Sequence, residues 1–402
     1  MIKLKKILSI IDLNYFIKNG FWLYQSYLIS LLTGFLLTFS YGNFLSKQTF
    51  GEFSFVLAVF SAINSFSLVG MGQALTHGFI RGFWGNYRVA IKQTLIFSLI
   101  GTIILIVLAI YYRSNLNLTF SFIYLALIFP FNAISTYYQS ILISQHRFKY
   151  ISAVNSISSL STVLIVIMAI FIQPSLFVLI LASTLPPLSI NLVLSWKFRQ
   201  SSKAVDYTYI KLGWHLSITQ AINFLTKSID KILLGLLLPF ENLALYSFAL
   251  IIPDQMYPLV RQIIILITPR ISSLAKSKLK RKILISFFSV LLILAIGIFF
   301  YIILAPFIFQ LFFPKFTQSI NLSQIYSLSL LSIPTTLLTL TFQRLKKNQI
   351  FYLQELTLLI LLVIFLWLLV PKYGIIGAVL AQVLSRMIYL LISFIGFLKI
   401  VM

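Results

Sequence analysis

Four basic residues lie inside apolar segments long enough to cross a bilayer: Lys227, Lys231, Arg261 and Arg386. A charged residue at the centre of a membrane helix costs about 2.5–3.5 kcal/mol on insertion scales, so these side chains are expected to face the inside of a helix bundle. Arginine makes bidentate contacts with phosphate, whereas lysine acts as a point charge. The four cations therefore predict a cavity wall that binds a diphosphate or an acidic sugar.

Acidic residues nearby in the sequence support a second interpretation. Asp230 follows Lys227 by three residues, the spacing at which side chains on one helix meet. Asp254 shares a helical face with Arg261, and Glu355 enters a later helix from its cytoplasmic end. These three acids are candidates for internal ion pairs, or for coupling transport to protons or sodium. Substrate binding and internal pairing both stay open at this point.

Apolar runs predict an all-α integral membrane protein. The chain has 402 residues, of which 60% are hydrophobic and 9% are charged, whereas soluble domains carry about a quarter charged residues. A helix needs about 20 apolar residues to cross a hydrocarbon core about 30 Å thick. The predicted spans, about twelve in number, are 21–41, 53–74, 93–112, 118–143, 151–172, 175–196, 212–238, 243–268, 283–304, 320–342, 350–370 and 374–398.

The basic residues between these spans predict the orientation of the chain. Of the 31 Lys and Arg, 23 lie in the two terminal segments and in every second connection, and only four lie in the other connections. By the positive-inside rule, both termini are cytoplasmic and the number of spans is even. The net charge of +24 then follows from topology. Nucleic acid is excluded as a partner because the cations are spread over many short loops.

Several kinds of chemistry have no residues to support them. The chain has no cysteine, which excludes disulfides, thiolate metal sites and thiol nucleophiles. Its histidines, His77, His146 and His215, all fall at predicted cytoplasmic ends, which argues against a metal site. No GxxxxGK[ST] phosphate loop is present, so ATP hydrolysis by that route is excluded. The sequence thus predicts a transporter without a bound cofactor rather than an enzyme.

A weak internal repeat predicts two related halves. Residues 45–59 (LSKQTFGEFSFVLAV) align with residues 238–252 (LPFENLALYSFALII), and each segment enters the second helix of its half. Because six helices are an even number, both halves insert the same way up. We therefore expect two parallel six-helix lobes, residues 1–198 and 199–402, around a central cavity.

Short motifs, most of them in the second half, resemble a known family. They are an Asp-x-x-x-x-Gly at 230–235, a Tyr-Ser-x-Ala at 246–249 and a Tyr-Gly-x-x-Gly-Ala at 373–378, with GQAL at 72–75 and TPR at 268–270. Together they resemble the O-antigen flippases (Wzx-type) of the multidrug/oligosaccharidyl-lipid/polysaccharide (MOP) exporter superfamily. The resemblance implies a MATE-like fold in the bacterial cytoplasmic (inner) membrane.

The resemblance also implies a substrate and partners. The cargo would be an undecaprenyl-diphosphate-linked oligosaccharide, flipped from the cytoplasmic to the outer leaflet by alternating access. Membrane lipids, a polysaccharide polymerase and chain-length machinery would be its partners, and protons, sodium or the membrane potential would drive it. An ion-coupled multidrug exporter is less favoured, because the first six predicted spans contain no clear intramembrane acid. A membrane oligosaccharide polymerase is less favoured again, because the outer loops are short and nearly uncharged.

Overall fold

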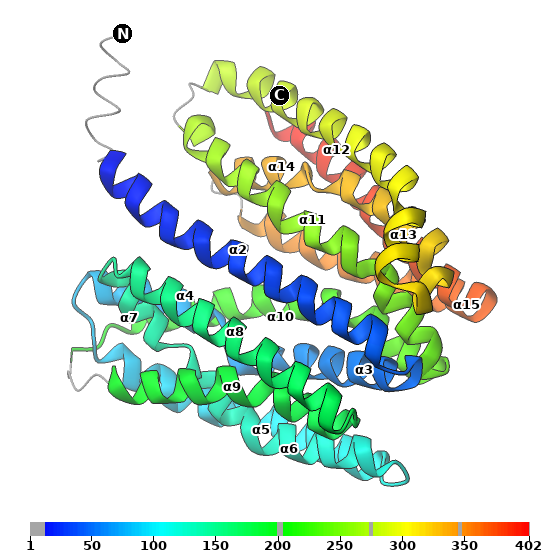
Figure 1. The fold of residues 1–402 in the computed structure, drawn as a ribbon. Coiled ribbons are helices and arrows are strands. Elements are labelled where there is room, and N and C mark those ends of the chain that lie inside the picture. Colours follow the sequence, from blue (N-terminus) through cyan, green and yellow to red (C-terminus); the bar gives the residue numbers. More distant parts are fainter. Residues whose placement is uncertain (1–12, 199–203, 273–275, 345–347, 402) are drawn as a thin grey trace. The chain divides into compact units, whose positions relative to one another are not determined.

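The computed structural model describes residues 13–198, 204–272, 276–344 and 348–401. Within these ranges only the backbone is described for 13–20, 23, 258–280, 340, 343–344, 348–352 and 400–401. The described part is helical throughout, with no strand (Figure 1). Eight of its helices are long and apolar enough to cross a membrane. The predicted all-α membrane fold is confirmed.

The described helices fall into two compact units, which do not follow a single division of the sequence. The first unit comprises Met1–Ser40 with Ile63–Ala221, and the second comprises Tyr41–Ala62 with Ile222–Met402. Each unit therefore holds a segment from the other half of the chain, and α2, α3 and α10 cross the division. The division into lobes 1–198 and 199–402, which was inferred from the internal repeat, stays a prediction.

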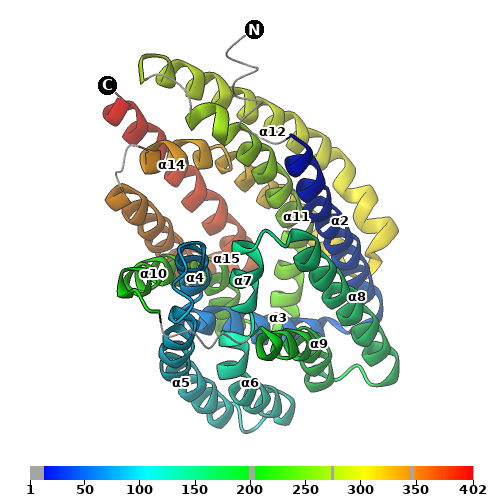
Figure 2. The same cartoon turned by 90° about the vertical axis from the view of Figure 1, so that its left-hand side faces the viewer.

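In the first unit, the helices in chain order are α2 (Leu13–Phe44), α4 (Gly70–Ile80), α5 (Asn86–Tyr111), α6 (Leu116–Ser135), α7 (Tyr138–Ser144), α8 (Phe148–Ile172), α9 (Leu176–Lys197) and the start of α10 (Tyr207–Leu237). Helices α5 and α6 pack side by side, as do α8 and α9 (Figure 2). The Tyr137 and Thr94 hydroxyls are hydrogen bonded at 2.6 Å inside the bundle. Buried hydroxyls of this kind connect membrane helices.

The second unit contains the rest of α10, together with α3 (Lys47–Ile63), α11 (Phe240–Ser272), α12 (Lys276–Phe312), α13 (Ile320–Ser327), α14 (Thr335–Arg344) and α15 (Asn348–Val401). Short 3₁₀ segments interrupt predicted spans at Asn64–Ser67 (η1) and Leu328–Ser332 (η3), and a third, Pro314–Ser319 (η2), follows α12. The predicted second span is thus α3, η1 and α4, and the tenth is α13, η3 and α14.

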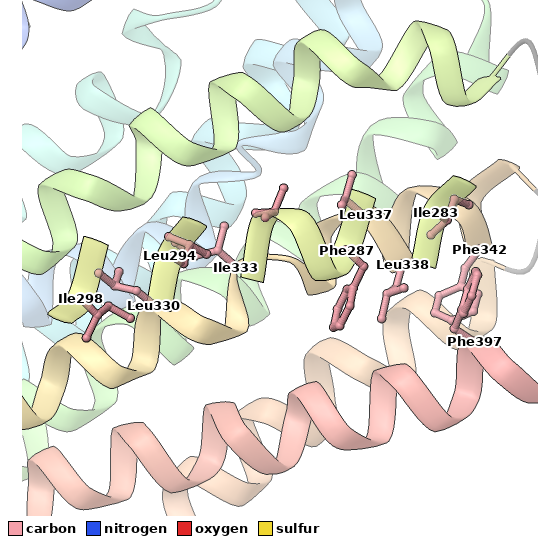
Figure 3. Packing of buried hydrophobic residues seen from close by; sticks show 11 residues of the cluster. Ile283, Phe287, Leu294, Ile298, Leu330, Ile333, Leu337, Leu338, Phe342 and Phe397 are labelled. Atoms are coloured by element: carbon pink, nitrogen blue, oxygen red, sulfur yellow. The ribbon is translucent and has the colours of Figure 1, made fainter. Parts of the chain in front are cut away.

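The core of the second unit is an apolar seam along α12. Ile283, Phe287, Leu294 and Ile298 recur at spacings of four or seven residues on one face of that helix. They pack against residues of η3, α14 and α15, including Phe397 (Figure 3). This seam holds α12, α14 and the second half of α15 together, and so helps to position the polar residues that those elements carry.

Helix α12 is longer than predicted. The predicted ninth span ends at residue 304, but α12 continues through Pro306 to Phe312. A proline inside a helix leaves the carbonyl four residues earlier without its donor. That carbonyl belongs to Ile302, and Gln324 of α13 donates to it at 2.8 Å. The replacement donor allows the helix to pass through the proline within the membrane.

A sharp reversal divides α15 into the predicted eleventh and twelfth spans. Gly374 has φ +56° and ψ −131°, a conformation that side chains make costly. A Cβ on Gly377 would lie 2.2 Å from the Leu369 carbonyl oxygen, so the two legs approach closely there. Ala378 is fully buried behind them. These contacts explain the Tyr-Gly-x-x-Gly-Ala motif as a tight turn between two membrane helices.

Candidate functional site

A buried carboxylate forms the centre of a polar cluster in the second unit. Asp230 of α10 is 1% exposed. Its Oδ2 atom accepts hydrogen bonds from the Tyr246 hydroxyl of α11 and, at 2.8 Å, from the Gln382 amide of α15. An unpartnered carboxylate would be very costly at this depth, so both donors stabilise it. The cluster therefore holds three helices together through one side chain.

An arginine lies on α15 one turn beyond Gln382. Arg386 donates from Nη1 to the Ser329 hydroxyl of η3 at 3.1 Å. Its guanidinium lies over the Tyr326 ring of α13, 5.3 Å from the centroid, within cation–π range. The Tyr326 hydroxyl in turn donates to Asp254 of α11 at 2.7 Å. Arg386 and Asp254 are thus connected through an aromatic ring and its hydroxyl.

The contacts of Asp230 and those of Arg386 are carried by shared faces of α11 and α15, so we treat them as one site. Gln382 and Arg386 are four residues apart on α15, and Tyr246 and Asp254 are eight apart on α11, so each pair shares a helical face. Two carboxylates and one guanidinium lie together in the cluster. Such a group can hold a fixed positive charge beside an acid, which suits either anion binding or ion coupling.

Close packing positions α10 within this unit. A Cβ on Gly235 would lie 2.3 Å from the Phe55 ring of α3, and one on Gly51 would lie 1.8 Å from the Phe240 carbonyl oxygen. Glycine at both positions therefore lets α3 pack directly against the ends of α10 and α11. This close approach places Asp230, one and a half turns before Gly235, opposite Tyr246.

The predicted cations take different positions. Lys227 is exposed, and the described donors to the Asp230 carboxylate come from other residues, so the i, i+3 pair considered from the sequence is not the contact formed. Lys231 is partly exposed. Arg261 lies on α11, but its side chain is outside the described residues. Glu355 is partly buried near the start of α15.

Sequence reasoning missed the neutral partners of the cluster. Tyr246 belongs to the Tyr-Ser-x-Ala motif and Asp230 to the Asp-x-x-x-x-Gly motif, so their shared resemblance could have suggested a contact. Gln382 lies four residues before Arg386 and could have been found by helical spacing. Tyr326 and Ser329 carry no such pattern, because they come from a broken helix whose geometry only the fold shows.

The fold is similar to solved structures of membrane exporters. It matches the inward-closed conformation of the lipid II flippase MurJ with a TM-score of 0.68 at 14% identity, over 94% of this chain and 87% of that one. An inward-facing multidrug resistance MATE transporter matches with a TM-score of 0.71 at 15% identity, over 93% and 94%. A MOP superfamily transporter from Pyrococcus furiosus matches with a TM-score of 0.59 at 15% identity, over 94% and 93%.

Sequence comparison gives the family. A search of curated proteins found no significant match. Residues 16–272, well over half of the chain, match the family model described as polysaccharide biosynthesis protein. The predicted resemblance to the MOP superfamily is confirmed by this match and by the shared fold. The chain therefore belongs to the polysaccharide biosynthesis protein family.

Proposed function

We propose that this chain flips an undecaprenyl-diphosphate-linked oligosaccharide, an O-antigen or capsule-type repeat unit, from the cytoplasmic to the outer leaflet. The observation that carries the proposal is the family match over residues 16–272. The similarity of fold to a lipid II flippase is consistent with a lipid-linked cargo. The protein is then a transporter of the bacterial inner membrane that works by alternating access, with both termini cytoplasmic and without catalytic residues.

The cations of the second unit suit a diphosphate. Arg386 is held by a hydrogen bond to Ser329 and by the Tyr326 ring. Lys227 is exposed and Lys231 partly exposed on α10, so both can reach an anion that the protein itself does not supply. Arginine contributes directional contacts and lysine contributes charge. Arg261 is the fourth residue proposed for this substrate site.

The membrane potential can supply part of the driving force. A lipid diphosphate is an anion that begins on the negative side of the membrane, and each charge that crosses outward gains about 2.3 kcal/mol per 100 mV. A doubly charged head group would gain on the order of 4–5 kcal/mol. Asp230, Asp254 and Glu355 are the candidates for proton or sodium coupling if the potential alone does not drive transport. A polymerase and chain-length machinery would receive the flipped repeat unit.

A flipping assay with purified protein tests this proposal. Proteoliposomes would carry an undecaprenyl-diphosphate-linked oligosaccharide with a labelled sugar, and a potassium–valinomycin gradient would set the potential. We expect outward flipping to rise when the cargo side is negative and to fall at least tenfold in Arg386→Gln. Efflux of a cationic dye without lipid flipping would contradict the proposal and would favour a multidrug exporter.

A further inference from the structure

We infer that the face formed by α5 and the start of α10 in the first unit binds an anionic phospholipid of the bilayer. We call this surface the α5–α10 face, and its cations are Arg88, Lys92 and Lys211, all of which are exposed. The inference requires only that the chain spans a membrane. It does not depend on the proposed flippase activity or on the polar cluster of the second unit.

Along α5, one exposed stripe changes from cationic to apolar. Arg88 and Lys92 occupy its first turns, and Ile96, Ile100 and Ile103 continue it at three- to four-residue spacing with exposed fractions of 57%, 40% and 60%. The opposite stripe of the same helix is buried. An amphiphile lying on this face would place its head group at the cations and its acyl chains along the isoleucines.

Helix α10 repeats the same pattern beside α5. Lys211 lies in the second turn of the helix and is exposed. Ile218, two turns further along, is 57% exposed. Tyr207, at the start of α10, is 63% exposed, as expected for an aromatic residue at a membrane–water interface. The cations and the apolar residues thus lie in the same order on both helices.

A tryptophan fixes the two stripes to each other. The Trp214 Nε1 atom donates to the Gln93 Oε1 atom at 2.9 Å, and its ring meets the Phe97 ring edge-on with centroids 5.0 Å apart. Lys92 adjoins Gln93, and Lys211 lies one turn before Trp214. The contact therefore holds the cations of both helices at the same end of the bundle.

The positive charge on this face exceeds the acidic charge of its unit. The whole first unit contains only two acidic residues, Asp12 and Asp206. Asp12 lies outside the described residues. Asp206 is engaged by its own helix, because the Thr208 amide donates to its carboxylate at 2.8 Å and holds the pKa of Asp206 below its ordinary value. Asp206 is thus the one acidic residue that the structure describes in this unit, and the three cations of the α5–α10 face exceed it in charge, which favours an anion from outside the chain.

A bilayer phospholipid supplies that anion together with matching acyl chains. Cationic residues next to a membrane surface each add about 1 kcal/mol of attraction to anionic lipids, which corresponds to about fivefold in affinity. A soluble anion would not explain the apolar continuation of both stripes. The chemistry that fits is a single phosphate-bearing head group with two hydrocarbon tails.

Native mass spectrometry of the full-length protein tests the inference. The probes are phosphatidylglycerol and phosphatidylcholine with identical acyl chains, added to delipidated protein in detergent. We expect wild type to retain phosphatidylglycerol preferentially. The triple variant Arg88→Gln/Lys92→Gln/Lys211→Gln should bind it about a hundredfold more weakly, at about fivefold for each lost cation.

The matched control removes the same charge elsewhere in the first unit. Arg113→Gln/Arg147→Gln/Lys197→Gln neutralises three exposed cations that lie off the α5–α10 face and should change phosphatidylglycerol affinity less than threefold. Equal losses in both triple variants would overturn the inference, since they would show a diffuse charge effect. A face variant that loses undecaprenyl diphosphate while retaining phosphatidylglycerol would also overturn it and would assign the face to the cargo.

Fluorescence quenching gives a second readout at the face itself. Phosphatidylglycerol with brominated acyl chains should quench wild type more than the Trp214→Phe variant, and the face triple variant should abolish that difference. Quenching that does not depend on Trp214 would contradict the placement of the lipid. Neither measurement involves transport, so failure here would leave the proposed flippase function untouched.

Discussion

Arg386 and the cations of the α5–α10 face are chemically alike but have opposite surroundings. Arg386 meets Ser329, the Tyr326 ring and, through that tyrosine, Asp254. Arg88 and Lys92 lie on an exposed stripe in a unit whose sequence holds two acidic residues. The first charge has an acidic residue within its own group of contacts, whereas the cations of the second group outnumber the acidic residues of their unit.

This difference separates a charge that supports the fold as well as the proposed cargo site from charges that contact only a ligand. Removing one member of a partnered, largely buried group leaves the others without their contacts and destabilises the fold. Removing an exposed cation without an internal partner usually changes stability by less than about 0.5 kcal/mol. Measuring stability and ligand binding on the same variants therefore tests whether the two classes are distinct.

The largest effect is expected at Arg386. Arg386→Gln removes the guanidinium from the Tyr326 ring and from Ser329, so we expect a loss of about 2–3 kcal/mol in the free energy of unfolding. Arg386→Lys keeps the charge but loses the planar guanidinium, so its free energy of unfolding should lie between those of wild type and Arg386→Gln. Thermal unfolding in detergent measures this, with Arg113→Gln as an exposed control. An Arg386→Gln variant as stable as wild type would show that Arg386 does not differ from the exposed cations in its effect on the fold.

A slightly smaller effect is expected at Asp230. Asp230→Asn replaces one of the two carboxylate oxygens with an amide donor, which faces the donor groups of Tyr246 and Gln382. We expect a loss of about 1–3 kcal/mol, the cost of leaving a buried polar group unsatisfied. A double-mutant cycle with Tyr246→Phe should give a coupling of about 1 kcal/mol. Strictly additive losses would contradict the hydrogen bond.

Much of the fold could be predicted because lipid imposes a simple pattern. Long apolar runs and alternating basic loops placed each predicted span where a helix or a pair of consecutive helices is found. The breaks at η1 and η3 could not be predicted from hydropathy, since polar residues such as Ser67 and Ser332 are buried in them and do not mark an end to the membrane segment.

The candidate site could be predicted only in part, and for a local reason. Spacing along one helix suggested that Lys227 and Asp230 would meet, but the backbone periodicity does not determine which way a carboxylate turns. Donors from two other helices, Tyr246 and Gln382, occupy it instead. Partners of this kind depend on tertiary packing, which a single sequence does not display.

Lipid-dependent stability tests whether the exposed cations of the α5–α10 face bind a ligand. If phosphatidylglycerol binds the α5–α10 face, a concentration ten times its dissociation constant should stabilise wild type by about 1.4 kcal/mol. The Arg88→Gln/Lys92→Gln/Lys211→Gln variant should show less than half of that gain, and should match wild type when lipid is absent. Differential scanning fluorimetry with and without the lipid checks both. A variant already destabilised in detergent alone would show that the face is structural.

The smallest expected change in stability is at Lys227, where the comparison is most informative. Lys227 is exposed, and the described donors to the Asp230 carboxylate are Tyr246, Gln382 and the Lys231 backbone amide, so Lys227→Ala should change the free energy of unfolding by less than about 0.5 kcal/mol. If the lysine contacts the diphosphate, flipping should nevertheless fall several-fold, and Lys227→Arg should retain most of it because the charge is kept. The control is Lys227→Ala combined with Asp230→Asn. Because the lysine is not the partner of Asp230, this double variant should show both losses and no recovery of transport. Recovery would mean that the two residues pair during the transport cycle and that Lys227 does not bind substrate.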